Sequence, residues 1–139
     1  MRFIRVIQSP PRILIVDDEP LVLHLLVGHL ERAGYQTTTA ANGEEGLRKF
    51  KEDEWSLVIT DKDMPKLGGE EMARAMKAIS PTTPIILLTG SGVIAGNPLF
   101  HAALEKPFRR HELLNVVQGI VGVTDSSGDS RSAKDATPP

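Results

Sequence analysis

The feature that most constrains the fold is a set of short apolar runs separated by segments with helical spacing. Three of these runs, rich in β-branched residues and leucine, occupy residues 13–16, 57–60 and 85–88. Successive side chains of a strand point to opposite faces of the sheet. A run in which every residue is apolar is therefore typical of a strand covered on both faces. Between the runs, apolar residues recur every three or four positions, as they do in amphipathic helices. This alternation predicts an α/β domain built around a parallel sheet.

Two weaker strands complete the predicted sheet. Residues 36–40 are rich in threonine, and residues 102–105 precede a Lys-Pro pair. After the first strand, Pro20 suits the first turn of a helix and Gly34 suits its end. The apolar stripe of that helix is predicted to comprise Leu21, Val22, Leu25, Leu26 and Leu30.

Later segments carry further helix and loop signals. Asn42 is a plausible N-cap for a second helix. The apolar residues expected to line a third helix are Met72, Met76 and Ile79. Residues 90–100 contain three glycines, an asparagine and a proline, and they predict a loop with at most one helical turn.

The chain of 139 residues fits a single domain. We expect residues 1–10 to be an N-terminal extension, residues 11–121 the folded domain and residues 122–139 a disordered tail. The formal net charge of -2 argues against direct binding to nucleic acid, which calls for a basic face. No apolar run approaches the roughly 20 residues that a membrane-spanning helix needs. Without cysteine there is no disulfide or thiolate site, and a cytoplasmic location is the default expectation.

Polar groups follow four of the predicted strands. Asp17 and Asp18 follow the first strand, Asp61 ends the third, Thr89 ends the fourth, and Lys106 follows the fifth. Ligands of open parallel sheets bind outside the carboxyl ends of the strands. Three carboxylates brought together there would repel one another, and an oxygen-only cluster suits a hard cation such as Mg²⁺. The sequence therefore predicts a site for a metal and a phosphate at this edge.

Each of these residues also has a plain structural interpretation. The acidic residues after the first strand could simply cap a helix, where negative charge is favourable. Asp61 and the Pro and Gly residues after it could form an ordinary turn. The functional interpretation makes the Asp61 carboxylate a nucleophile toward phosphorus, with an acyl phosphate as the product. Thr89 would then donate a hydrogen bond to the phosphoryl group, and Lys106 would balance its charge.

These residues, in this order and spacing, resemble the receiver domain of two-component response regulators. The resemblance runs from about Arg12 to Val121 and rests on four motifs. They are Asp17-Asp18, Asp61-x-x-Met64-Pro65 with Gly69, Thr89-Gly90 and Lys106-Pro107-Phe108. The resemblance implies a flavodoxin-like (βα)₅ three-layer sandwich with parallel strand order 2-1-3-4-5.

The resemblance also implies roles for the site residues. Asp61 would be the phosphoacceptor, supplied by a histidine kinase or phosphotransfer protein, with Thr89 and Lys106 assisting. Asp17, Asp18, Asp61 and the main-chain carbonyl of Asp63 would hold Mg²⁺. Members of the family catalyse their own phosphotransfer and slow dephosphorylation, which differs from conventional enzyme turnover.

Three features depart from the family pattern. Ala103 stands where receivers usually place an aromatic residue whose rotation couples to the threonine. The interval from Thr89 to Lys106 is short, so the helix between the fourth and fifth strands is expected to be short or irregular. Lys62 follows the phosphoacceptor, and its side chain is expected to point into solvent.

Two other functions fit parts of the sequence. A receiver-fold module could act through partner contact alone, without phosphate. Asp61-x-Asp63 also resembles the nucleophile motif of haloacid-dehalogenase-type phosphatases, although those chains normally carry it on their first strand. No output domain follows residue 121, so we expect a single-domain regulator acting on a downstream protein partner, or a piece of a longer protein. The sequence identifies neither the kinase nor the output.

Overall fold

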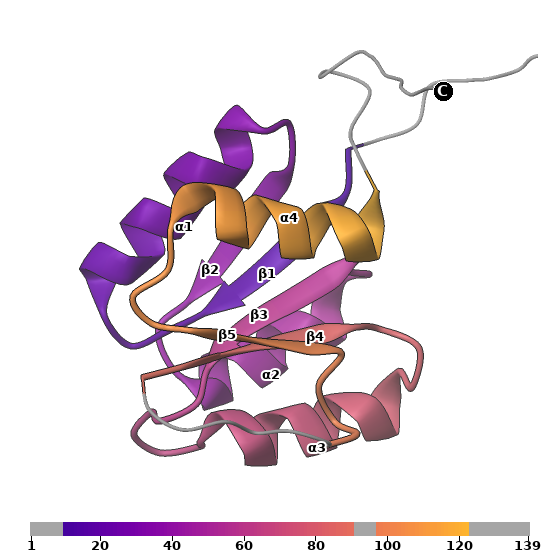
Figure 1. The fold of residues 1–139 in the computed structure, drawn as a ribbon. Helices are drawn as coiled ribbons and strands as arrows, with labels where there is room; N and C mark the ends of the chain where they lie inside the picture. Colours follow the sequence, from indigo (N-terminus) through magenta and orange to yellow (C-terminus); the bar gives the residue numbers. More distant parts are fainter. Residues whose placement is uncertain (1–9, 91–96, 123–139) are drawn as a thin grey trace, which may run out of the picture.

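The centre of the protein is a parallel sheet of five strands (Figure 1). The computed structural model describes residues 10–90 and 97–122 of the chain. The strands run in the order β2-β1-β3-β4-β5, and each pairs in parallel with its neighbours. Their bounds are β1 Arg12–Val16, β2 Gln36–Ala40, β3 Leu57–Asp61, β4 Ile85–Thr89 and β5 Ala102–Glu105. The predicted strands and the strand order implied by the family resemblance are thus confirmed.

In the described part of the chain, four helices cover the sheet in two layers. They are α1 Pro20–Arg32, α2 Gly43–Glu52, α3 Gly69–Ile79 and α4 Arg110–Val121. Figure 1 shows α1 and α4 on one face of the sheet and α2 and α3 on the other. The flavodoxin-like three-layer architecture is therefore present. No helix in the described part of the chain has the length and apolar character required to cross a membrane.

The two faces of β1 show why the apolar runs are uninterrupted. Ile13 and Ile15 belong to the core beneath α1 and α4, whereas Leu14 and Val16 belong to the core beneath α2 and α3. All four side chains are fully buried. Each buried aliphatic side chain of this size contributes about 1.5–3 kcal/mol of burial free energy. Two covered faces therefore explain both the composition of the strand and its central place in the sheet.

Helix α1 differs from its predicted apolar stripe. Leu26 and Leu30 are fully buried, and Val22 packs against the same core. Leu21 and Leu25, however, are 83% and 50% exposed, so their assignment to the buried stripe is wrong. They precede Val22 and Leu26 by one position each, which turns them about 100° around the helix and away from the sheet. Helix α1 thus presents an apolar surface to solvent.

Helix α3 shows a smaller departure of the same kind. Met72 and Met76 are fully buried, as predicted. Ile79, at the last position of the helix, is 50% exposed and does not line the core.

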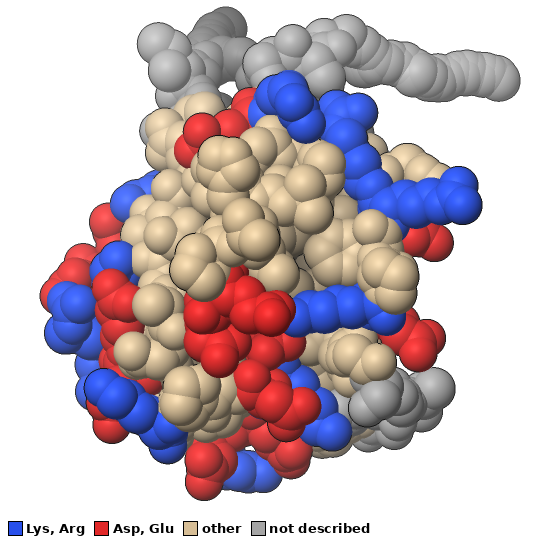
Figure 2. Space-filling model, turned by 90° about the vertical axis from the view of Figure 1, so that its left-hand side faces the viewer, with Lys and Arg blue, Asp and Glu red and all other residues tan. Residues whose placement is uncertain are grey.

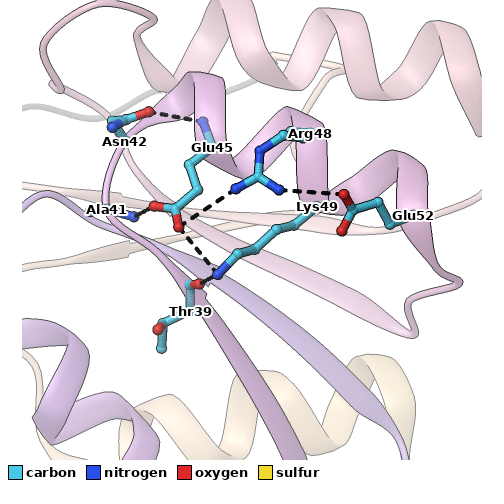
Figure 3. A network of polar contacts seen from close by, with 7 residues as sticks. All are labelled: Thr39, Ala41, Asn42, Glu45, Arg48, Lys49 and Glu52. Atoms are coloured by element: carbon cyan, nitrogen blue, oxygen red, sulfur yellow. Dashed lines mark hydrogen bonds and ion pairs between the residues drawn. The ribbon is translucent and has the colours of Figure 1, made fainter.

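The start of α2 is fixed by a polar network that joins it to β2 (Figure 3). Asn42 caps the helix as predicted, because its Oδ1 accepts a hydrogen bond from the Glu45 amide at 2.8 Å. The Glu45 carboxylate in turn accepts one from the Ala41 amide at 2.7 Å and lies 3.2 Å from Lys49 Nζ. Lys49 also donates to the Thr39 carbonyl. The hydrogen bond from Ala41 lowers the pKa of Glu45 below its ordinary value, because this bond favours the ionised carboxylate.

Three predictions from the sequence lie wholly or partly outside the described residues. They concern the N-terminal extension, the C-terminal tail and the short or irregular helix, because residues 1–9, 91–96 and 123–139 are not described. Between β4 and β5, the described residues 97–100 form a turn, and Leu99 and Phe100 pack against the core beneath α2 and α3. These three predictions stay predictions.

Candidate functional site

The polar residues at the strand ends meet at one edge of the sheet. Asp17 follows β1, Asp61 ends β3, and Lys106 follows β5. Carboxylate oxygens of Asp17, Asp18 and Asp61 all lie within 4.8 Å of one another. Figure 2 looks onto the side where the strands end, and it shows acidic side chains gathered at its centre with a basic side chain beside them. The structure thus brings together the carboxylates that the sequence singled out.

Asp17 is the most deeply placed of the three carboxylates. Its side chain is fully buried, and its Oδ1 accepts a hydrogen bond from the Glu19 amide at 2.8 Å. Its Oδ2 is buried without a hydrogen-bond partner among the described residues. Burial raises the pKa of Asp17, and the charge of Asp61 raises it further against the opposing effects of the Glu19 amide and Lys106. A buried acceptor without a donor carries a desolvation cost that a bound cation would relieve.

Lys106 provides positive charge within this cluster. Its Nζ donates a hydrogen bond to Asp61 Oδ1 at 2.9 Å and lies 3.5 Å from Asp17 Oδ2. A third carboxylate, that of Glu19, lies 3.9 Å from the same nitrogen. Burial alone would lower the pKa of Lys106, but the hydrogen bond to Asp61 and the surrounding negative charges raise it overall. Lys106 therefore stays protonated beside Asp61.

Asp61 is held by the close approach of α3 to the end of β3. The Gly69 amide, at the first position of α3, donates to the Lys62 carbonyl at 2.9 Å. A Cβ atom at Gly69 would lie only 2.2 Å from the Asp61 carbonyl oxygen. Thr60 Oγ1 donates to that same oxygen at 2.9 Å. The glycine is needed here because only hydrogen fits between the two backbones. The Asp61 side chain is left 12% exposed.

Thr89 and Lys106 are linked through the backbone. Thr89 is buried at the end of β4, and its carbonyl accepts a hydrogen bond from the Lys106 amide at 2.7 Å. The peptide bond between Lys106 and Pro107 is cis. The hydrogen bond from the Lys106 amide to Thr89 fixes the backbone from which the lysine side chain extends.

The remaining predicted residues lie at the surface. Asp18 and Asp63 are exposed, and Lys62 is half-buried. Among the described residues, the Lys62 side chain makes no ion pair with the acidic cluster. Its orientation into solvent stays a prediction. Sequence reasoning missed Glu19 as a member of the charge cluster. Its position directly after two aspartates was the available signal, but that position fits a helix terminus equally well.

The donor set fits a magnesium ion. Among the described residues, the carboxylates of Asp17, Asp18, Asp61 and Glu19 surround one ammonium group, that of Lys106, so this cluster has an excess of negative charge. The carboxylate atoms that could bind a metal are all oxygens, and one of them, Asp17 Oδ2, is buried and accepts no hydrogen bond among the described residues. Mg²⁺ prefers such ligands and commonly binds through one or two carboxylates together with phosphate oxygens.

Comparisons with known proteins agree with this geometry. Residues 13–118 match the family model described as the response regulator receiver domain. The chain is 36% identical over 115 residues to the response regulator receiver protein CpdR of Brucella abortus, covering 79% of this chain and 96% of that protein. It is 40% identical over 78 residues to the transcriptional regulatory protein PhoP of Bacillus subtilis, but it spans only 32% of that longer protein.

Solved structures show the same fold. The response regulator TrrA of Thermotoga maritima, crystallised in complex with Mg²⁺ and BeF, is 36% identical with a TM-score of 0.75. That match covers 79% of this chain and 98% of TrrA. A receiver domain protein from Clostridium thermocellum is 34% identical, also with a TM-score of 0.75, over 80% of this chain and 94% of that one.

Proposed function

The chain belongs to the response regulator receiver domain family, and on this premise we propose that it is a phosphorylation-activated switch of a two-component phosphorelay. In this proposal Asp61 accepts a phosphoryl group from a histidine kinase or phosphotransfer protein. The observation that carries the proposal is the placement of the Asp61 carboxylate, 2.9 Å from the Lys106 ammonium and beside Asp17 and Asp18. Profiling phosphotransfer from candidate kinases tests it and identifies the donor.

The proposed step moves the phosphoryl group between two side chains. An Asp61 carboxylate oxygen attacks phosphorus, the bond from phosphorus to the donor's imidazole nitrogen breaks, and the imidazole takes up a proton from solvent. Lys106 remains beside the carboxylate to balance the charge that arrives with the phosphate. The Thr89 hydroxyl donates to a phosphoryl oxygen, as its position at the end of β4 suggests.

A magnesium ion completes the proposed site. Asp17, Asp18, Asp61 and the main-chain carbonyl of Asp63 would hold it, and TrrA was crystallised with Mg²⁺. When bound, the ion would offset the carboxylate charge and the charge of the incoming phosphoryl oxygens. Asp17 Oδ2 supports this assignment because it is buried and accepts no hydrogen bond among the described residues, and the ion would be a closer positive partner than Lys106 at 3.5 Å.

Mg²⁺ should raise the melting temperature of the wild-type protein. The ion relieves carboxylate repulsion only in the folded state, and a concentration a hundredfold above Kd adds about 2.7 kcal/mol to the free energy of unfolding. Asp17→Asn should melt higher than wild type without metal, because a costly buried charge is gone, and should lose most of the response. Thermal melts with and without Mg²⁺, at ionic strength matched with KCl, measure both effects. An equal response in Asp17→Asn would exclude Asp17 as a ligand.

The surface next to the site supports a protein rather than a small molecule as the natural donor. Leu21 is 83% exposed at the start of α1, three residues after Asp18, and Leu25 lies one turn further along the same side. Exposed apolar side chains grouped in this way are typical of protein interaction sites. We therefore assign this apolar surface of α1 to the docking of the phosphoryl donor.

Leu21→Ser should separate docking from chemistry. Phosphotransfer from the cognate kinase should slow by about tenfold, the equivalent of about 1.4 kcal/mol. Phosphorylation by acetyl phosphate should keep its wild-type rate, because this small donor needs no docking surface. Ile79→Ser, which changes an exposed apolar residue on α3, serves as the control and should leave both rates unchanged. Equal slowing with both donors would contradict the assignment of Leu21 to docking.

One observation favours a second function, that of a receiver-fold module that signals without phosphate. Ala103 is exposed on β5 and offers no aromatic ring to couple with Thr89. The phosphate-independent function is supported if acetyl phosphate with Mg²⁺ adds no phosphoryl mass to the protein. A haloacid-dehalogenase-type phosphatase finds no support in the family match. In either function the output would be contact with a downstream protein in the cytoplasm, without direct binding to nucleic acid.

A further inference from the structure

Helix α2 begins against the β3–α3 loop, which comprises residues 62–68. Gly43, the first residue of α2, is buried. A Cβ atom at this position would lie 2.2 Å from the Leu67 carbonyl oxygen and 2.8 Å from Leu67 Cβ. Both distances are shorter than a side-chain carbon can tolerate in a close-packed interior. The start of α2 and the β3–α3 loop therefore touch at a point where only hydrogen fits.

The β3–α3 loop is tightly turned where α2 touches it. The Leu67 amide donates a hydrogen bond to the Pro65 carbonyl at 2.9 Å, and Lys66 between them has a φ of 71°. A lysine in this left-handed region is strained, and such a conformation persists only where the surrounding structure holds it. The Leu67 side chain packs against the core beneath α2 and α3. Leu67 is thus held between that core and Gly43.

The segment that enters α2 also contacts the other side of the carboxylate cluster. The Asp17 amide donates a hydrogen bond to the Ala40 carbonyl at 3.1 Å. The Asn42 side chain then caps α2 and fixes where the helix begins (Figure 3). One short segment, from Ala40 to Gly43, therefore contacts the backbone of Asp17 on one side and that of Leu67 on the other.

The position of the β3–α3 loop matters for metal binding because Asp63 lies within it. The main-chain carbonyl of Asp63 is one of the proposed Mg²⁺ ligands. Rotation of a side chain cannot move this carbonyl, so the path of the loop alone determines where it lies. Mg²⁺ demands near-ideal octahedral geometry and tolerates misplaced ligands poorly. The affinity for Mg²⁺ should therefore depend on what holds the loop.

We propose that Gly43 is a positioning residue for the metal site. Because it has no side chain, α2 approaches the β3–α3 loop closely enough to hold Leu67, and through Leu67 the loop that carries Asp63. Gly43 itself contacts neither the metal nor the phosphoryl group. The inference rests on the proposed function, since it assumes that Mg²⁺ binds at the carboxylate cluster.

Gly43→Ala should weaken Mg²⁺ binding by about tenfold or more. The new Cβ pushes Leu67 away from α2, and the loop moves with it. Loss of the groups that orient metal ligands typically costs about 10–100-fold in affinity. Isothermal titration calorimetry with MgCl₂ measures the dissociation constant. The rate of phosphorylation by acetyl phosphate should return toward the wild-type value at saturating Mg²⁺, because the Asp61 nucleophile is unchanged. An unaltered dissociation constant in folded Gly43→Ala would overturn the proposal.

Gly46→Ala is the matched control, because it makes the same change further along α2. Its Cβ would lie 2.9 Å from Met72 Sδ and 2.9 Å from Val16 Cγ2, so it presses on core side chains and not on the loop. This variant should lose stability in chemical denaturation but keep the wild-type affinity for Mg²⁺. An equal loss of affinity in both glycine variants would show general destabilisation, and it would contradict a positioning role for Gly43.

Leu67→Ala tests the same loop by removing atoms, and it decides the question if Gly43→Ala does not fold. The side chain that packs the loop against the core is lost, so Mg²⁺ binding should weaken here too. Wild-type affinity in Leu67→Ala would overturn the inference while leaving the proposed function intact. A wild-type protein that binds no Mg²⁺ would instead overturn the proposed metal site, and this inference with it.

Discussion

Asp61→Asn should abolish phosphorylation of this protein by acetyl phosphate with Mg²⁺. The wild-type chain is expected to gain the mass of one phosphoryl group, and hydroxylamine should remove it because the product is an acyl phosphate. An amide cannot act as the carboxylate nucleophile, so the variant should gain no such mass. Intact-protein mass spectrometry before and after hydroxylamine treatment measures the difference.

The fold should survive this substitution. Asp61→Asn removes one negative charge from a cluster with excess negative charge, so its melting temperature without metal should equal or exceed that of wild type. Asp53→Asn makes the same chemical change at an exposed position on the other edge of the sheet and should be phosphorylated normally. A hydroxylamine-sensitive adduct on Asp61→Asn would move the acceptor to another carboxylate.

Gly69→Ala should damage stability and phosphorylation together. The new Cβ would lie 2.2 Å from the Asp61 carbonyl oxygen, so the start of α3 must move away from the end of β3. Overpacking against backbone of this kind typically costs about 1–3 kcal/mol. The displaced backbone also carries the Asp61 carboxylate, so phosphorylation should slow as well. Chemical denaturation and the acetyl phosphate assay measure the two effects.

Gly28→Ala is the matched control for this substitution. Gly28 lies within α1, and a Cβ there would meet no atom within 4 Å. Alanine in a helix interior is favoured over glycine by about 0.5–1 kcal/mol, so this variant should be more stable than wild type. Its phosphorylation should be unchanged. Similar stability losses in Gly28→Ala and Gly69→Ala would show that close backbone packing is not the reason for glycine at position 69.

The parts of the fold that the order of apolar residues determines were predictable from the sequence. Ile13 to Val16 are apolar without interruption because both faces of β1 are covered, and that pattern identifies a central strand. The strand order came from the family resemblance, because an apolar run does not show which strands lie beside it in the sheet. Once a parallel sheet was predicted, Asp17, Asp61 and Lys106 had to share an edge, and the structure brings them together.

The exposed surfaces of the helices were not predictable in the same way. Periodicity identifies apolar positions, but it does not show how wide a sector of a helix the sheet covers. Leu21 and Leu25 fit the helical pattern as well as Leu26 does, yet only Leu26 is buried. The contacts of Glu19 and Trp55 were not predictable for a different reason. Their surroundings depend on residues far apart in the chain, Lys106 for Glu19 and Arg12 for Trp55.

The most direct measurement of the central claim is to identify the side chain that carries the phosphoryl group. Borohydride reduces an aspartyl phosphate to homoserine, and peptide mass spectrometry then locates that homoserine in the sequence. After reaction with acetyl phosphate, homoserine is expected at position 61 alone, and only when Mg²⁺ was present. Homoserine at another aspartate, or an equal yield at position 61 without the metal, would contradict the account.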